Sequence, residues 1–196
     1  MRLQRPMMLA ALTTLVGCAE PSATGPSAPT VRRGTQSASA DGVQASTTGG
    51  GHYLLQGLYD TKFSFSANQN GNGEANGEFR VSVDFGGTDG TASFKGAVTC
   101  MASDPVNGRA WIGGVITENT STSPTYQVAI TEPGRDIWFR VLDSGEGSDA
   151  AADRTSFVGF TGSAGIQTSA EYCAVKLWAD GNARTHAVTS GNIQVR

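Results

Sequence analysis

The sequence predicts an all-β fold, a single antiparallel β-barrel or β-sandwich of about eight strands that follows a disordered N-terminal tether. From position 52 onward, apolar and polar side chains alternate with a period of two, as they do along a strand with one buried face. Glycine makes up 26 of the 196 residues and only 16% of residues are charged, a composition that favours short strands and turns over long helices. No amphipathic helical pattern longer than one turn interrupts the alternation.

The expected strands follow one another at short intervals. The clearest alternation places Phe79, Val81 and Val83 on one face. Asn107-Gly108 is typical of a tight hairpin. Consecutive hairpins form a meander, which slightly favours a closed barrel over a sandwich. The expected strands cover residues 63–66, 79–85, 92–102, 109–118, 126–130, 136–143, 156–161, 172–178 and 186–195.

Residues 1–17 have the pattern of an export signal. Arg2 and Arg5 provide the positive start, and residues 7–15 form a short apolar run. This run is too short for a permanent membrane span, which needs about 20 residues.

The four residues Leu15-Val16-Gly17-Cys18 resemble the lipobox of bacterial lipoproteins. The resemblance implies cleavage before Cys18 and a diacylglycerol on its sulfur. The mature protein would then belong to the cell envelope, with this lipid anchoring it to a membrane. Ala19 follows the cysteine in place of the Asp that often retains such proteins at the inner membrane, which favours the outer membrane or cell surface. The alternative is an ordinary signal peptide that ends near a cysteine.

Residues 18–51 are expected to form the lipidated cysteine and a disordered linker. The segment is rich in Ser, Thr, Ala, Gly and Pro and lacks apolar periodicity, so it offers little apolar surface to bury. A flexible chain of this length reaches roughly 30 Å. An N-terminal arm docked on the domain is the alternative, and residues 52–196 form the expected β domain.

Cys100 and Cys173 remain as an even pair in an oxidising compartment. Each shares a predicted strand face with apolar neighbours, so both sulfurs are expected to point into the core and form a disulfide. Two free buried thiols are the main alternative, and a metal site is less favoured.

Charge and motifs exclude several functions. The net charge of −3 and the lack of a basic cluster argue against nucleic-acid binding. The two histidines, His52 and His186, stand outside known catalytic motifs and are expected in solvated loops. A non-enzymatic, monomeric protein is therefore expected.

One acidic segment is a candidate calcium site, and the sequence suggests no other cofactor. Asp143, Glu146, Asp149 and Asp153 lie within a Gly-containing loop, and calcium takes six to eight oxygen ligands. Gly occupies positions where an EF-hand loop needs side-chain oxygens, so an ordinary connecting loop is the alternative.

A second candidate site is aromatic and cationic. Trp138 and Arg140 share one face of a predicted strand, and Tyr172, Lys176 and Trp178 share one face of another. If the opposite faces form the core, these residues offer rings and charges to a glycan or protein ligand. The alternative is that loops cover them.

Three segments, residues 94–100, 110–117 and 141–147, resemble an uncharacterised β domain of secreted bacterial proteins. The resemblance covers about residues 53–196 and implies a β fold without an assigned activity. The leading hypothesis is a binding or accessory module. A barrel that carries a small apolar ligand is the alternative, and a hydrolytic enzyme ranks third.

Replacing Cys18 by Ala is expected to move the protein from membranes to the soluble fraction, because the thiol that accepts the lipid is lost. Fractionation of cells that express each form measures this. Unchanged membrane association of Cys18→Ala would contradict the lipid anchor.

Overall fold

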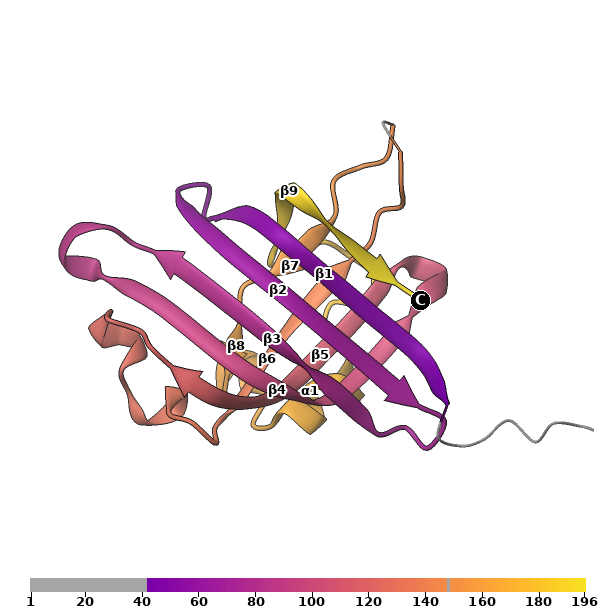
Figure 1. Cartoon of the computed structure of the whole chain (residues 1–196), viewed down its shortest axis with the longest axis horizontal. Helices are drawn as coiled ribbons and strands as arrows, with labels where there is room; N and C mark the ends of the chain where they lie inside the picture. The colour runs from indigo at the N-terminus through magenta and orange to yellow at the C-terminus, as the bar shows by residue number, and fades with distance from the viewer. Residues whose placement is uncertain (1–41, 148) are drawn as a thin grey trace, which may run out of the picture. The chain divides into compact units, whose positions relative to one another are not determined.

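The computed structural model describes residues 42–147 and 149–196 (Figure 1). The expected signal peptide, the lipidated Cys18 and most of the expected linker lie outside these residues. The described strands are β1 (Val43–Leu55), β2 (Tyr59–Asn70), β3 (Ala75–Asp84), β4 (Thr91–Asp104), β5 (Arg109–Asn119), β6 (Asp136–Leu142), β7 (Arg154–Ser156), β8 (Gly159–Phe160) and β9 (Thr185–Val195).

The strands form one antiparallel sheet that closes on itself. Their order is β5-β4-β3-β2-β1-β9-β7-β6-β8, and β5 also pairs with β6, so eight strands make a ring and β8 is added beside β6. In Figure 1 the long strands β1 to β4 cross in front of β5, β6 and β7. The prediction of an antiparallel all-β domain is confirmed, and the barrel is the form it takes.

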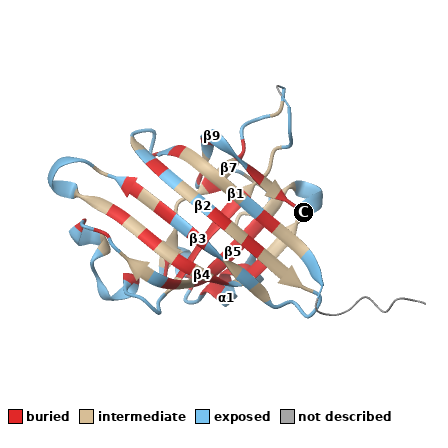
Figure 2. Cartoon of the chain, viewed as in Figure 1, coloured by how far each residue is buried: buried red, intermediate tan, exposed pale blue. Residues whose placement is uncertain are grey.

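Apolar side chains fill the interior of the barrel. They alternate along the strands with less buried residues, as predicted, and Figure 2 shows this as bands of different burial. Aromatic rings meet at its centre. The Phe139 ring lies 5.3 Å from that of Phe65 and 5.7 Å from that of Phe79, both edge to face. Such edge-to-face pairs add stability beyond their buried area.

The barrel begins earlier than the expected boundary at residue 52. Strand β1 starts at Val43, so the end of the expected linker is part of the sheet. Gly49 explains why: a Cβ there would lie 2.7 Å from Phe65 Cε1 and 2.9 Å from Ile193 Cγ1. Neighbouring strands supply the apolar side chains over this glycine, so composition wrongly predicted a linker for residues 43–51.

A β-bulge reverses the expected orientation of Cys100. The pairing of β4 with β5 shifts register between Val98 and Cys100. An extra residue moves each later side chain to the other face of the strand. Val98 and Met101 therefore lie in the core, and Cys100 lies on the outside of the barrel. The expectation that its sulfur points into the core is wrong.

The strand expected over residues 172–178 is wrong, because α1 (Ser169–Val175) replaces it. Thr168 caps this helix by accepting a hydrogen bond from the Glu171 backbone at 3.1 Å. The Glu171 carboxylate in turn accepts one from Gln167 N at 2.8 Å. Within the described part of the chain, no helix is both long and apolar enough to cross a membrane.

The strand expected over residues 126–130 is also wrong. Two short 3-10 helices, η3 (Pro124–Tyr126) and η4 (Ala129–Thr131), occupy this stretch. The Asn119 amide donates hydrogen bonds to the carbonyls of Tyr126 (2.8 Å) and Thr131 (2.9 Å). The Asn119 side chain thus pairs backbone carbonyls that a neighbouring strand would pair in a sheet.

Substituting Gly49 by Val is expected to destabilise the barrel by ~1–3 kcal/mol, because the added methyl groups collide with Phe65 and Ile193. Gly50→Val is the control, since the nearest atom to a Cβ there is Phe63 O at 3.4 Å. Urea unfolding of both variants measures the difference. Equal stability of the two would contradict this account of β1.

Candidate functional site

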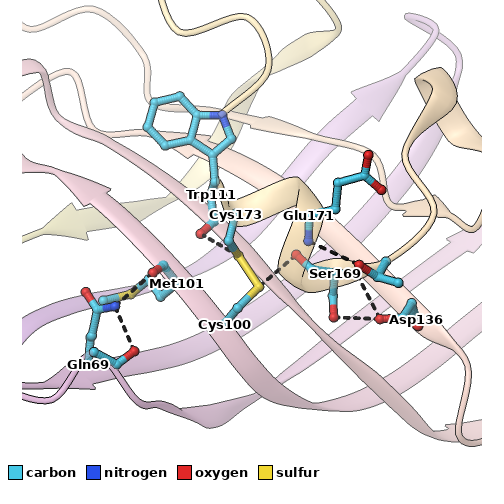
Figure 3. The surroundings of a disulfide bond; sticks show 10 residues. Gln69, Cys100, Met101, Trp111, Asp136, Ser169, Glu171 and Cys173 are labelled. Carbon is cyan, nitrogen blue, oxygen red and sulfur yellow. Dashed lines mark hydrogen bonds between the residues drawn. A yellow bond between two sulfur atoms is a disulfide. The ribbon is translucent and has the colours of Figure 1, made fainter. Parts of the chain in front are cut away.

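A disulfide fastens α1 to the outside of the barrel. Cys100 on β4 and Cys173 on α1 are bonded, with their Cα atoms 6.2 Å apart (Figure 3). Gly113 on β5 makes room beneath them, because a Cβ there would lie 2.7 Å from the Cys100 sulfur and 2.8 Å from Ser169 Cβ. The predicted disulfide is confirmed, although it lies outside the barrel.

Polar contacts hold both ends of the helical segment. The backbone N–H and the hydroxyl of Ser169 donate to Asp136 Oδ1 at 2.8 and 2.6 Å, where α1 begins (Figure 3). Beyond its end, Trp111 Nε1 donates to Leu177 O at 2.9 Å. Helix, disulfide and side chains together cover the outer face of β4, β5 and β6.

Beneath this cover lies a second apolar cluster, separate from the barrel interior. It comprises Trp111, Trp138, Ile166 and Tyr172. The Trp138 ring stacks on that of Tyr172, with centroids 5.7 Å apart and planes 21° apart. Trp138 is 4% exposed and Tyr172 is 2% exposed, so neither forms an open platform. The alternative that other segments cover these rings holds for both.

Arg140 is buried under the same cover. Its guanidinium donates to the carbonyl of Trp178 through Nη1 and to that of Ala183 through Nη2, the latter at 2.8 Å. Burial lowers the pKa of Arg140, with the charges of Arg109 and Arg154 adding to the effect. The predicted binding residue Arg140 therefore holds the segment after α1 against the barrel.

A cleft of about 340 Å³ opens at the edge of this outer layer. Three of the predicted binding residues, Trp138, Tyr172 and Trp178, line it together. Lys176 is exposed at the end of α1 and is not among the lining residues. The full lining is Leu55, Gln56, Trp138, Ser156, Phe157, Val158, Gly159, Ser163, Ala164, Tyr172, Trp178, Arg184 and His186.

His186 lines the cleft, although its sequence context predicted a solvated loop. It lies on β9, where its ring stacks on Tyr53 with centroids 5.3 Å apart and planes 13° apart. Burial lowers the pKa of His186, and the positive charge of Arg154 lowers it further. A neutral imidazole is therefore favoured at neutral pH, with one nitrogen able to donate and the other to accept.

Backbone strain is concentrated around this cleft. Five non-glycine residues among those described have a positive φ, and four of them line the cleft: Gln56 (56°), Ala164 (55°), Trp178 (57°) and Arg184 (59°). Each such residue costs on the order of 1–3 kcal/mol and persists where the surroundings hold it, often at a functional site. No sequence pattern marks these conformations, which is why Gln56, Ala164 and Arg184 were not predicted.

Polar groups at the floor of the cleft have no partner within the described structure. The Tyr172 hydroxyl and Trp138 Nε1 make no hydrogen bond to another described residue, and neither atom belongs to the fully buried side-chain atoms that lack a partner. Trp111 Nε1, by contrast, is bonded to Leu177 O. Both atoms therefore reach the cleft and are available to hydrogen-bond a molecule there.

The acidic loop predicted to bind calcium contacts strand β9. Asp153 Oδ2 accepts a hydrogen bond from Ile193 N at 2.7 Å, and Asp143 Oδ2 accepts one from Val195 N at 3.0 Å. Glu146 Oε1 accepts another at 3.0 Å from the side chain of Asn192. These carboxylates satisfy donors along β9 beyond the reach of β7, which pairs only with residues 185–187.

Asp149 lies in the same loop, beside Ser148, which is not described. Among the described residues, no three His, Cys, Asp or Glu side chains form a group that could hold a metal ion. The arrangement lends no support to calcium binding, which stays a prediction.

The barrel interior bears on the carrier hypothesis. A gap beside Phe65, Phe79 and Phe139 measures about 10 Å³, room for about one water molecule. Pockets that hold small ligands measure roughly 300–1,000 Å³. The outer cleft reaches that size, and the interior gap does not.

No family model, curated protein or solved structure matches this chain. The resemblance to an uncharacterised secreted β domain therefore identifies no family. Interpretation of the cleft rests on its own chemistry.

Replacing both Cys100 and Cys173 by Ala is expected to lower the free energy of unfolding by about 4 kcal/mol, because the crosslink joins two residues separated by 73 positions in sequence and so closes a long loop. Urea unfolding with and without reductant measures this. The wild type should lose comparable stability on reduction, while the double variant should not respond. An unchanged unfolding midpoint in the double variant would argue against a structural role for the bond.

Proposed function

We propose that the β domain is a non-enzymatic binding module that takes a glycan into the outer cleft, in a protein held at the cell envelope by lipid on Cys18. The observation that carries the proposal is the cleft itself, where aromatic rings, unpaired polar groups and four strained residues converge. Residues in strained backbone conformations cluster at ligand-binding and active sites.

The chemistry of the lining supports a sugar. Trp178 is half-buried and Trp138 and Tyr172 lie deeper, so ring surfaces are combined with an indole N–H and a phenol hydroxyl. A pyranose presents apolar C–H groups on its faces and hydroxyls around its edge. Rings that carry a polar group suit such a ligand, because one end contacts the C–H face and the other bonds a hydroxyl.

The size of the cleft supports a glycan over a protein partner. Its volume of about 340 Å³ falls at the lower end of the range for small-ligand pockets. A stable protein interface covers roughly 800 Å² on each side, far more than a hollow of this size provides. One or two sugar units fit the available space.

The non-enzymatic part of the proposal is supported by the composition of the lining. Among the described residues that line the cleft, His186 is the sole histidine, and none is Asp or Glu. Glycoside hydrolysis normally uses a pair of carboxyl groups on either side of the scissile bond. Binding without cleavage is the activity that these residues favour.

The lipid anchor and linker would complement such a module. A linker ahead of β1 would hold the cleft away from the membrane, at a distance set by the length and flexibility of the chain. Glycans of the cell envelope or of its surroundings would then be within reach.

Trp178→Ala is expected to weaken glycan binding at least tenfold, because a half-buried indole ring, more accessible than Trp138 or Tyr172, is removed from the cleft. The Trp178 carbonyl that Arg140 bonds is kept, so the fold should persist. Val106→Ala, at a residue 93% exposed within η2 (Pro105–Asn107), is the control. Binding to an array of envelope and capsular saccharides, followed by calorimetry on the strongest hit, measures the effect. Wild-type affinity in Trp178→Ala would place the site elsewhere, and a wild type that binds no saccharide would refute the proposal.

A further inference from the structure

We infer that the glycan bound by this cleft is acidic and that Arg184 binds a carboxylate on one of its sugar units. This inference rests on the proposed function and adds the charge of the ligand. It depends on the charges around the cleft and on the state of Arg184.

The described residues that line the cleft carry no negatively charged side chain. The chain contains 17 Asp and Glu residues, yet none of the 13 residues that line the cleft is acidic. Arg184 contributes a permanent positive charge to the lining. The lining is thus opposite in sign to the net charge of −3 of the whole chain. An anionic group would meet no repulsion from a lining carboxylate.

The Arg184 guanidinium is held against an aromatic ring and has no acidic partner among the described residues. Its guanidinium carbon lies 5.1 Å from the centroid of the Trp178 ring, a cation–π arrangement. No hydrogen bond or ion pair joins this guanidinium to another residue in the described ranges. Stacking on the ring restricts its motion and leaves the N–H groups at its edge free. A planar guanidinium held in this way matches a carboxylate through two parallel hydrogen bonds.

Two further arginines lie close to the cleft. Arg140 is buried behind Trp178, whose carbonyl it bonds. Arg154 bonds the hydroxyl and the carbonyl of Thr185, both at 2.8 Å, and its charge acts on His186. Both guanidiniums have carbonyl or hydroxyl oxygens as their partners here, and such oxygens do not cancel a full positive charge. Their field adds to that of Arg184 and is weakly screened in a partly buried site.

Other side chains of the lining complete the recognition of a sugar acid. Trp178 offers an apolar face beside the guanidinium, so a sugar ring and its carboxylate can be bound next to each other. Gln56, another lining residue in the turn between β1 and β2, offers an amide for hydroxyl groups. The arrangement suits a hexuronate unit better than a free carboxylate, which would leave the rings uncovered.

The test compares sugars that differ only in charge. Oligomers of galacturonate, glucuronate and mannuronate are each paired with the neutral oligosaccharide made by reducing their carboxylates to alcohols. Calorimetry with the purified full chain measures both members of each pair at low and high ionic strength. We expect at least one acidic oligomer to bind tenfold or more tightly than its neutral counterpart, with a preference that shrinks as salt rises.

Arg184→Gln should lower the affinity for the acidic oligomer to that of its neutral counterpart, so that the tenfold preference for the acidic member disappears. Arg184→Lys should retain part of the preference, because the charge is kept and the two-bond geometry is lost. Arg80→Gln, an exposed arginine on the outer face of β3, is the matched control and should behave as wild type. Circular dichroism and the unfolding midpoint of each variant verify its fold.

Each outcome bears on a different claim. Equal affinity for acidic and neutral members of every pair, or an equal loss of both in Arg184→Gln, would overturn the acidic ligand and leave the glycan cleft in place. A wild type that binds neither member of any pair, nor any saccharide of the array, would overturn both proposals.

Discussion

Closure of the sheet between β5 and β6 is the constraint on which the rest of the structure depends. Pairing from Arg109 with Leu142 to Val115 with Asp136 turns an open meander into a ring. On its other edge, β5 lies close against β4 at Gly114, where a Cβ would stand 1.9 Å from Ala97 O. A closed ring leaves its long strands without free edges and encloses one core.

Closure also determines where the second layer forms. Strands β5 and β6 are buried along most of their length on both faces, unlike the other strands, whose burial alternates. Their inner residues join the barrel core, and their outer residues lie under α1. Trp111, Trp138 and Arg140 fasten that cover through stacking and hydrogen bonds. The disulfide adds a covalent link between the two layers.

The cleft combines a rigid floor with walls made by loops. Trp138 belongs to a strand of the ring, while Gln56, Ala164 and Arg184 come from connections far apart in sequence. These three are exposed and adopt left-handed backbone conformations that cost free energy. A site built in this way is formed before a ligand arrives, which reduces the conformational entropy lost on binding.

Residues outside the known motifs account for the charge of the cleft. Arg140 and Arg154 use backbone carbonyls and a hydroxyl as partners, so their positive charges persist beside the lining. Acidic side chains are used elsewhere, along β9, where Asp143 and Asp153 bind backbone N–H groups. This separation of charge is the basis of the proposed preference of the outer cleft for an anion.

The sequence by itself determined the all-β class, most strand positions and the pairing of Cys100 with Cys173, because side-chain alternation and cysteine count are local properties. Only tertiary structure decided which face each residue occupies. A bulge after Val98 turned Cys100 outward, and hydrogen bonds from Thr168 and Glu171 made a helix of a segment whose alternation resembled a strand. Gly49 belongs to a strand because Phe65 and Ile193 fill the space above it. Convergence of Trp138, Tyr172, Trp178 and Arg184 required contacts between distant segments, which no local pattern encodes.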